Sequence, residues 1–513
     1  MNPASRQSVR GFSWEIGGMA AGLLLQLGYA AYTGRHVSPA DFGSYAVALS
    51  LSFPVSAVTH GLAQLTLTSQ RSVRIHPLST VRLPLVSGLL LFAVSQALAP
   101  FWARLFDAPH LLELLRCLAF HGLLSPFAVV CTTLLRTRRE NRAAALLELG
   151  GQALGLVAGA ALLTAGWNPM GLAAMWPVAN VVPAVGGALL LRSTAAPEDA
   201  ELPANTRDSP PNRELRDCLQ YAIVHVLTVC LAIWAASWAL GAVGTGHYSR
   251  AYYFAAMLAG VLNSAIVRIA VPDLTRAEED GSSFDRVLLD MLCLASALGA
   301  LFLGMCGALG PVVLPLLLGS SWEISGSMVP WFMPGFATLL LCMVGYGADR
   351  VRNMMPWVFC VQRVVAAAVA LVVAVSVALR SPQLLALSTA FATAAGHVIQ
   401  LRRWHRDRVV NVPRLLHAYA VHLGIGLIVF LAGSMGGLLV DGPAAMAAVL
   451  CAILPVLLAA WVCRSFIPAL QTSTARGPLG RAPSKAGFAA SVVSGTAPRP
   501  EATGRGKQSE RHL

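Results

Sequence analysis

The sequence predicts an all-helical protein that crosses a membrane many times. Of its 513 residues, 56% are hydrophobic and 12% are charged, and the mean hydropathy is +0.64. An ordinary soluble domain carries about a quarter charged residues. The apolar runs are continuous and long enough to span a bilayer as helices, whereas the strands of a membrane barrel alternate apolar and polar residues. A polytopic helical bundle is therefore the expected fold.

The apolar runs predict about fourteen transmembrane helices of roughly 20 residues each. They lie near residues 12–33, 44–67, 83–102, 114–135, 143–165, 171–191, 218–243, 254–274, 287–309, 329–348, 356–379, 384–401, 415–436 and 445–468. The first run follows Arg6 and Arg10, as the apolar part of a signal peptide would. Because it is long enough to span and many further spans follow, we expect an uncleaved first helix.

The arginines predict the orientation of these helices. The formal net charge of +13 would suggest nucleic-acid binding in a soluble protein. Here the arginines concentrate in every second connection, as the positive-inside rule expects of short cytoplasmic loops. The connections expected outside contain only Arg35, Arg104, Arg250 and Arg380. This pattern predicts a multi-pass protein with both termini in the cytoplasm and no nucleic-acid partner.

The polar segment 192–217 is expected to divide the chain into two lobes. It contains Pro and mixed charges, which is typical of a flexible cytoplasmic linker. Residues 1–191 would form an N-terminal lobe of helices 1–6, and residues 218–401 a C-terminal lobe of helices 7–12. Residues 402–471 would add a basic loop and two extra helices, and residues 472–513 a disordered basic cytoplasmic tail.

Two stretches on either side of this linker resemble each other. "FGSYAVALSLSFPVSAVTHGLAQL" at 42–65 is echoed by "TGHYSRAYYFAAMLAGVLNSAIVR" at 245–268. An offset of 203 residues pairs Gly43 with Gly246, Tyr45 with Tyr248 and His60 with Asn263. Each stretch is expected to be a short outside turn that enters a helix, so the turn would mark the same corner in each half. The repeat predicts two bundles of the same orientation, as in many transporters.

Motifs of enzymes and of metal sites are missing from the sequence. The ten cysteines form no CxxC pair, so neither a disulfide framework nor a zinc site is expected. The chain also has no Walker A, HExxH or GxSxG motif. We therefore expect a transporter rather than an enzyme, with no catalytic residues, no metal site and no cofactor.

Three stretches resemble one known family. "VSPADFGSYAVALSLS" (37–52), with "HGLAQLTLTSQR" downstream, is similar to the start of bacterial polysaccharide transporters. "GHYSRAYYFAAMLAGVLNSAIVRIAVPDLTRAEED" (246–280) and "LPLLLGSSWEISGSMVPWF" (314–332) resemble later segments of the same family, in the same order. These transporters are lipid-linked oligosaccharide flippases of the MATE-like MOP superfamily. The resemblance covers roughly the first two thirds of the chain.

The resemblance implies a flippase of the bacterial inner membrane. Its cavity would be lined mainly by the first, second, seventh and eighth helices. Its cargo would be an undecaprenyl-diphosphate-linked oligosaccharide repeat unit, moved by alternating access from the cytoplasmic to the periplasmic leaflet for exopolysaccharide, capsule or O-antigen synthesis. A polymerase and a chain-length regulator would be its partners in the pathway, beside the lipid bilayer. A cation-coupled multidrug exporter and, from another class, a polysaccharide polymerase remain as alternatives.

Polar residues inside the predicted spans are the candidates for binding the cargo. Arg268 lies about 10 Å from the inner end of its helix, where it could bind the diphosphate or reach the headgroups. Gln26 and Asn263 could bind sugar hydroxyls or link helices. His60 and His225 could line the cavity and relay protons, or form hydrogen bonds between helices.

Two acidic residues and one further arginine have weaker placements. Glu15 and Asp273 could form a cation or proton site or a gate, or could only reach interfacial water. Coupling to Na⁺ or H⁺ therefore stays open. Arg363 is expected to reach the headgroups or to pair with another helix, because its span is not expected to line the cavity.

Overall fold

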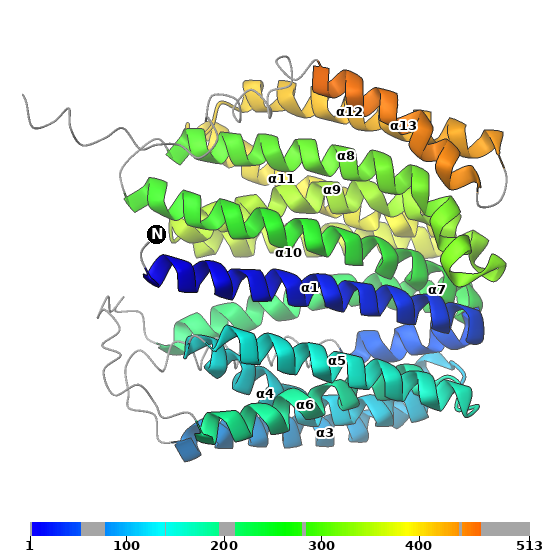
Figure 1. The fold of residues 1–513 in the computed structure, drawn as a ribbon. Helices are drawn as coiled ribbons and strands as arrows, with labels where there is room; N and C mark the ends of the chain where they lie inside the picture. Colours follow the sequence, from blue (N-terminus) through cyan, green and yellow to red (C-terminus); the bar gives the residue numbers. More distant parts are fainter. Residues whose placement is uncertain are drawn as a thin grey trace, which may run out of the picture.

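The protein is a bundle of long helices in a computed structural model that describes residues 3–52, 77–138, 140–193, 211–279, 284–440 and 444–462 (Figure 1). No strand occurs in these described residues. Ten of their helices are long and apolar enough to cross a membrane. The all-helical polytopic fold is thus confirmed, while the number of fourteen spans stays a prediction.

The helix bounds follow the apolar runs of the sequence. The helices are α1 (Pro3–His36), α3 (Pro77–Phe106), α4 (Leu111–Thr137), α5 (Asn141–Thr164), α6 (Met170–Ser193), α7 (Pro211–Glu279), α8 (Phe284–Leu318), the short 3-10 helix η1 (Ser320–Trp322), α9 (Glu323–Val351), α10 (Met355–Ala378), α11 (Pro382–Arg406), α12 (Val412–Leu439) and α13 (Ala444–Val462). Between α1 and α3, residues 39–52 are also helical.

Gly241 divides α7 into two helices. A straight helix of 69 residues would be about 100 Å long, more than three times the thickness of the hydrocarbon core. Gly241 has φ 68° and ψ −175°, a conformation that residues with a Cβ rarely adopt. We therefore describe α7 as a first segment, 211–240, and a second segment, 242–279. The expected outside turn near 244–253 is instead the first part of the second segment.

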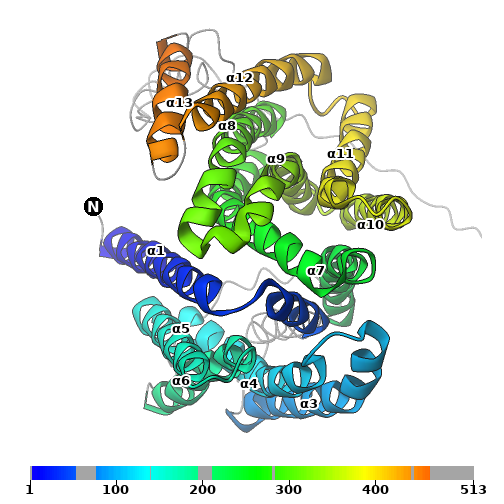
Figure 2. The same cartoon turned by 90° about the vertical axis from the view of Figure 1, so that its right-hand side faces the viewer.

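The helices fall into two groups when the bundle is seen from its end (Figure 2). Helices α3 to α6 lie on one side and α8 to α13 on the other, with α1 and α7 between them. Helix α1 packs mainly on α5, and α7 packs mainly on α9 and α10. The division of the chain into two lobes stays a prediction; we term the described residues up to Ser193 the N-terminal half and those from Pro211 onward the C-terminal half.

Several connections meet at one end of the bundle, here termed the turn end. The side-chain amide of Asn168 donates to the carbonyl oxygen of His36 at 3.1 Å. From η1 in the C-terminal half, the Trp322 indole N–H donates to the carbonyl oxygen of Gly34 at 2.7 Å. The Arg35 guanidinium donates to the carbonyl oxygen of Leu316 at 3.4 Å. The end of α1 is thus fixed to both halves.

A glycine stripe on α5 positions one wall of the molecule. Gly151, Gly155 and Gly159 recur every four residues, and a Cβ at each would collide with a backbone carbonyl of α6. Small residues at this spacing let two helices approach closely inside a membrane. The close contact holds the inward face of α6, with Trp176, beside that of α5, with Gln152.

Candidate functional site

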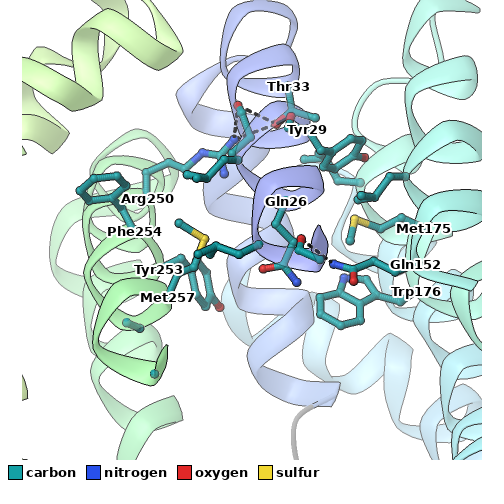
Figure 3. A pocket seen from close by; sticks show the side chains of 18 of the residues that line it. Gln26, Tyr29, Thr33, Gln152, Met175, Trp176, Arg250, Tyr253, Phe254 and Met257 are labelled. Atoms are coloured by element: carbon teal, nitrogen blue, oxygen red, sulfur yellow. Dashed lines mark hydrogen bonds between the residues drawn. The ribbon is translucent and has the colours of Figure 1, made fainter. Parts of the chain in front are cut away.

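A cavity of about 730 Å³ lies between the two halves of the bundle. It is enclosed by α1, residues 39–52, α5, α6, the second segment of α7 and the end of α8. Figure 3 shows its polar side chains, which include Gln26, Tyr29, Gln152, Arg250 and Tyr253. Its volume is in the range of cavities that bind small molecules.

The helical repeat explains which side chains reach this cavity. On α1, Gln26, Tyr29 and Thr33 are three and four residues apart, so they lie on one face. On α7, Arg250, Tyr253 and Met257 have the same spacing and also face the cavity (Figure 3). Helix α1 therefore presents a polar stripe to the cavity, and α7 presents Arg250 and Tyr253 followed by the apolar Met257.

Arg250 is the cationic side chain among the described residues that line the cavity. Its Nη2 donates to the Thr33 hydroxyl oxygen at 2.8 Å and to the Ala30 carbonyl oxygen at 3.3 Å. Its Cζ lies 3.8 Å from the centre of the Phe42 ring and 5.6 Å from that of Trp322, close enough for cation–π attraction. No ion pair among the described residues includes Arg250. The guanidinium is therefore neutralised by no neighbouring carboxylate in the described part of the chain.

Two buried polar atoms at the cavity have no hydrogen-bond partner among the described residues. They are the Nε of Arg250 and the hydroxyl oxygen of Tyr253. Leaving such atoms unpaired is costly, and each exception needs an explanation. A ligand that accepts from Arg250 and bonds the Tyr253 hydroxyl would satisfy both atoms.

Aromatic side chains form the opposite wall. The Trp176 indole N–H donates to the Tyr45 hydroxyl at 2.7 Å, and the Tyr29 hydroxyl donates to the Gly171 carbonyl oxygen at 3.3 Å. These bonds fix the rings in place. Rings with polar tips can both stack on a sugar and form hydrogen bonds with it.

Amide and carboxylate groups lie farther from the turn end. The Gln152 amide donates to the Gly22 carbonyl oxygen at 3.3 Å, and Gln26 projects beside it (Figure 3). Glu148 also lines the cavity, but the Arg136 guanidinium forms an ion pair with it at 2.6 Å. The Glu148 charge is thus balanced locally, whereas Arg250 has no such carboxylate partner.

The two repeated glycines bring two backbone segments into contact at the turn end. A Cβ on Gly43 would collide with the Ala242 carbonyl oxygen, and a Cβ on Gly246 would collide with the Pro39 carbonyl oxygen. The backbones of 39–52 and of the second α7 segment therefore cross in direct contact. The Gly43–Gly246 pair found in the sequence repeat is this crossing.

Comparison with known proteins now identifies the family. The sequence model of the family Polysacc_synt, described as "Polysaccharide biosynthesis protein", matches residues 8–278, more than half of the chain. The chain belongs to this family. No curated protein matches the sequence.

Solved transporters have the same fold as this Polysacc_synt protein. The lipid II flippase MurJ, in an inward closed conformation, superposes with a TM-score of 0.70 over 90% of this chain and 100% of that chain, at 11% identity. A multidrug resistance MATE family transporter of the MOP superfamily, in an inward-facing conformation, gives 0.59 over 77% and 96%, at 15% identity. The eukaryotic MATE transporter AtDTX14 gives 0.54 over 88% and 99%, at 13% identity. At such low identities these likenesses show the fold alone.

The predicted site residues of this Polysacc_synt protein have different placements. Gln26 lines the cavity. Asn263 lies in α7 but not at the cavity, and its buried side-chain oxygen has no hydrogen-bond partner among the described residues. Asp273 forms an ion pair with Arg276, one turn along α7, at 3.3 Å.

The remaining predictions fall beyond the described side chains. His60 lies outside the described residues. Arg268 and His225 lie in α7 and Glu15 lies in α1, but their side chains are not among those that the structure describes. Arg363 is exposed and donates to the Phe359 carbonyl oxygen of its own helix at 3.3 Å.

Arg250 was missed because the sequence predicts an outside turn at its position. Gly241, Gly244 and Gly246 lie within six residues of one another, which is typical of a loop. Only Gly241 forms the turn; Gly246 lies in the helix, where the Pro39 backbone packs against it. Starting the helix after Gly241 would have placed Arg250 inside the membrane.

Proposed function

We propose that the protein is a flippase that moves an undecaprenyl-diphosphate-linked oligosaccharide repeat unit across the inner membrane. The observation that carries this proposal is Arg250, a cation without a carboxylate partner among the described residues, in a cavity between two halves of a polysaccharide biosynthesis protein. A diphosphate is the natural counterion for such a guanidinium, which can bind it through two hydrogen bonds.

The rest of the cavity suits the sugars of that cargo. Tyr253 offers a hydroxyl without a partner among the described residues, Trp176 an aromatic face, and Gln26 and Gln152 offer amides. Sugar hydroxyls both donate and accept hydrogen bonds, so mixed donors and acceptors beside aromatic rings match them. The diphosphate would lie toward the turn end, with the sugars along α1 and α5.

Orientation follows from the arginine-rich connections, which we assign to the cytoplasm. The turn end then faces the periplasm, and the contact between Gly43 and Gly246 seals that side. Transport would separate this crossing and close the cytoplasmic end. The product would pass to a polymerase and a chain-length regulator. Coupling to Na⁺ or H⁺, with Glu15 and Asp273 as candidate residues, remains part of the proposal.

A multidrug exporter is the second candidate function. The MATE-like fold and the aromatic wall favour it, because a planar drug cation would stack there. A drug cation needs a carboxylate, however, and Glu148 is already paired with Arg136. Among the described residues that line the cavity, the charge without a balancing partner is that of Arg250, which favours an anionic cargo.

Deleting the gene tests the proposal. The deletion strain should lose surface polysaccharide and accumulate lipid-linked repeat units, and the unaltered chain should restore export. Arg250→Gln should lower export about tenfold or more. Export by Arg250→Lys should lie between that of Arg250→Gln and that of the unaltered chain, because lysine keeps the charge but cannot form two parallel hydrogen bonds with a phosphate. Arg104→Gln is the matched control, since Arg104 is exposed at the end of α3.

Two results would overturn the flippase proposal. One is normal polysaccharide in a deletion strain that has no second transporter of this kind. The other is normal polysaccharide together with increased sensitivity to cationic drugs, which would establish the exporter instead.

A further inference from the structure

We propose that Arg250 is a substrate-operated latch. In the empty transporter its guanidinium holds the turn end closed, and the anionic cargo binds the same guanidinium. This inference rests on the proposed function. Opening of the crossing would then follow cargo binding.

The latch joins the two halves through one side chain. Arg250 extends from the second segment of α7, and its Nη2 is bonded to Thr33 and Ala30 at the end of α1. The same guanidinium lies on the Phe42 ring, three residues after Pro39 in the helix 39–52. One cation therefore connects α7 to α1 and to the helix 39–52.

The position of the latch relates it to the crossing. Arg250 follows Gly246 by four residues, about 6 Å along the same helix. Phe42, beneath the guanidinium, directly precedes Gly43. Phe42 also packs edge-on against Trp322 at 5.2 Å, and Trp322 bonds the Gly34 carbonyl oxygen. Releasing Arg250 would therefore weaken the packing of Phe42 and Trp322 beside the contact between Gly43 and Gly246.

The geometry of a guanidinium makes the two uses compete. It can bind a phosphate through two parallel hydrogen bonds in two ways, from Nε with Nη2 or from Nη1 with Nη2. Both ways require Nη2, and Nη2 is the atom that donates to Thr33 and Ala30. Nε of the same group is buried and has no hydrogen-bond partner in the part of the chain that the structure describes. A diphosphate that binds Nε and Nη2 together therefore competes with Thr33 and Ala30 for the hydrogens of Nη2.

This arrangement would couple transport to cargo. An empty transporter keeps its turn end closed, because Arg250 has no better acceptor than α1. Binding of the diphosphate transfers the guanidinium from α1 to the cargo and frees the crossing to separate. After release of the cargo, Thr33 and Ala30 become the best acceptors again, and the turn end closes.

Cysteine labelling in nanodiscs, where both faces are accessible, tests the latch. Ser44 is fully buried beside the crossing, so Ser44→Cys should react with maleimide only when the turn end opens. Mass spectrometry of the peptide that contains residue 44 separates its labelling from that of the natural cysteines. Removing the latch with Arg250→Gln or Thr33→Val should raise the labelling rate about tenfold or more.

Two matched controls accompany these variants. Arg104→Gln removes an exposed arginine of the turn end. Thr164→Val removes a hydroxyl that, like that of Thr33, donates to a carbonyl of its own helix, here that of Ala161 at 2.8 Å. Neither should change the labelling. Thr33→Val keeps every charge in place, so the test stands even if Arg250→Gln does not fold.

Inorganic pyrophosphate serves as the probe for competition. It should raise labelling of the Ser44→Cys chain severalfold and have no effect in the Arg250→Gln background. Unchanged labelling in both latch variants, or slower labelling with pyrophosphate, would overturn the latch. These measurements need no polysaccharide export, so the latch and the flippase proposal can fail independently.

Discussion

The two halves of the sequence repeat are alike at the crossing and different just below it. At the crossing, the backbone of each segment packs directly against the glycine of the other, Gly43 or Gly246. Four residues further along, the repeat offset pairs Val47 with Arg250. Val47 is buried among apolar neighbours, whereas Arg250 faces the cavity.

A backbone contact and an anion site place different demands on the residues at paired positions. A symmetrical contact needs the same small residue on both sides, since either Cβ would separate the backbones. Binding an anion needs only one cation, and a second buried one would add desolvation and repulsion. The two stretches thus share the glycine at 43 and 246, while only the second has a charged residue at the next paired position, Arg250.

The largest effect is expected from breaking the symmetrical contact. Gly246→Val should prevent closure of the turn end, because its side chain would enter the Pro39 backbone, which cannot move aside as a flexible side chain could. Export should fall at least tenfold, and labelling of Ser44→Cys should become fast with or without pyrophosphate. The measurements are surface polysaccharide and labelling rate.

Gly28→Ala provides the control for that substitution. Gly28 lies in α1, and a Cβ there would meet nothing within 4 Å. We expect unchanged labelling and a gain of about 0.5–1 kcal/mol in the free energy of unfolding, since Ala favours a helix interior over Gly. Slow, normal labelling in Gly246→Val would show that the crossing is not the gate.

The sequence predicted the fold better than the cavity, and the repeat segments show why. Continuous apolar runs identify helices because membrane burial requires them. The Gly43–Gly246 pairing was visible as a repeat, but a single amino-acid sequence does not show that the two glycine-containing segments are in contact. Contact between segments 203 residues apart depends on how the halves pack.

Arg250 shows the limit for the site. A glycine-rich stretch indicates a turn, and the sequence places Arg250 within it, outside the membrane. In the structure, the chain turns at Gly241, whereas Gly246 lies in the helix and leaves room for the Pro39 backbone. Gln26 was predicted from its polarity inside an apolar run, a signal that Tyr253 and Trp176 do not give, since aromatic residues are common in membrane helices.

A smaller effect should separate two tyrosines of the cavity. The Tyr253 hydroxyl has no partner among the described residues, whereas the Tyr45 hydroxyl accepts from Trp176. Tyr253→Phe should lower export severalfold if that hydroxyl binds cargo, and it should not lower the thermal stability, because it removes an unsatisfied group. Tyr45→Phe should cost about 1 kcal/mol of stability and lower export less. Equal export in both variants would contradict a cargo role for Tyr253.

The smallest effect concerns two glutamines that have the same bond in different places. The Gln152 amide donates to the Gly22 carbonyl oxygen at 3.3 Å, and the Gln96 amide donates to the Arg116 carbonyl oxygen at 3.2 Å. Only Gln152 lines the cavity. Each Gln→Leu change removes one bond between helices, worth about 0.6 kcal/mol in a membrane, so the two melting temperatures should fall by similar small amounts. Only Gln152→Leu should also lower export, about two- to threefold, because an amide at the cavity can bond a sugar hydroxyl. If Gln96→Leu reduces export as much as Gln152→Leu does, the loss reflects helix packing, and the amide wall has no part in recognising the cargo.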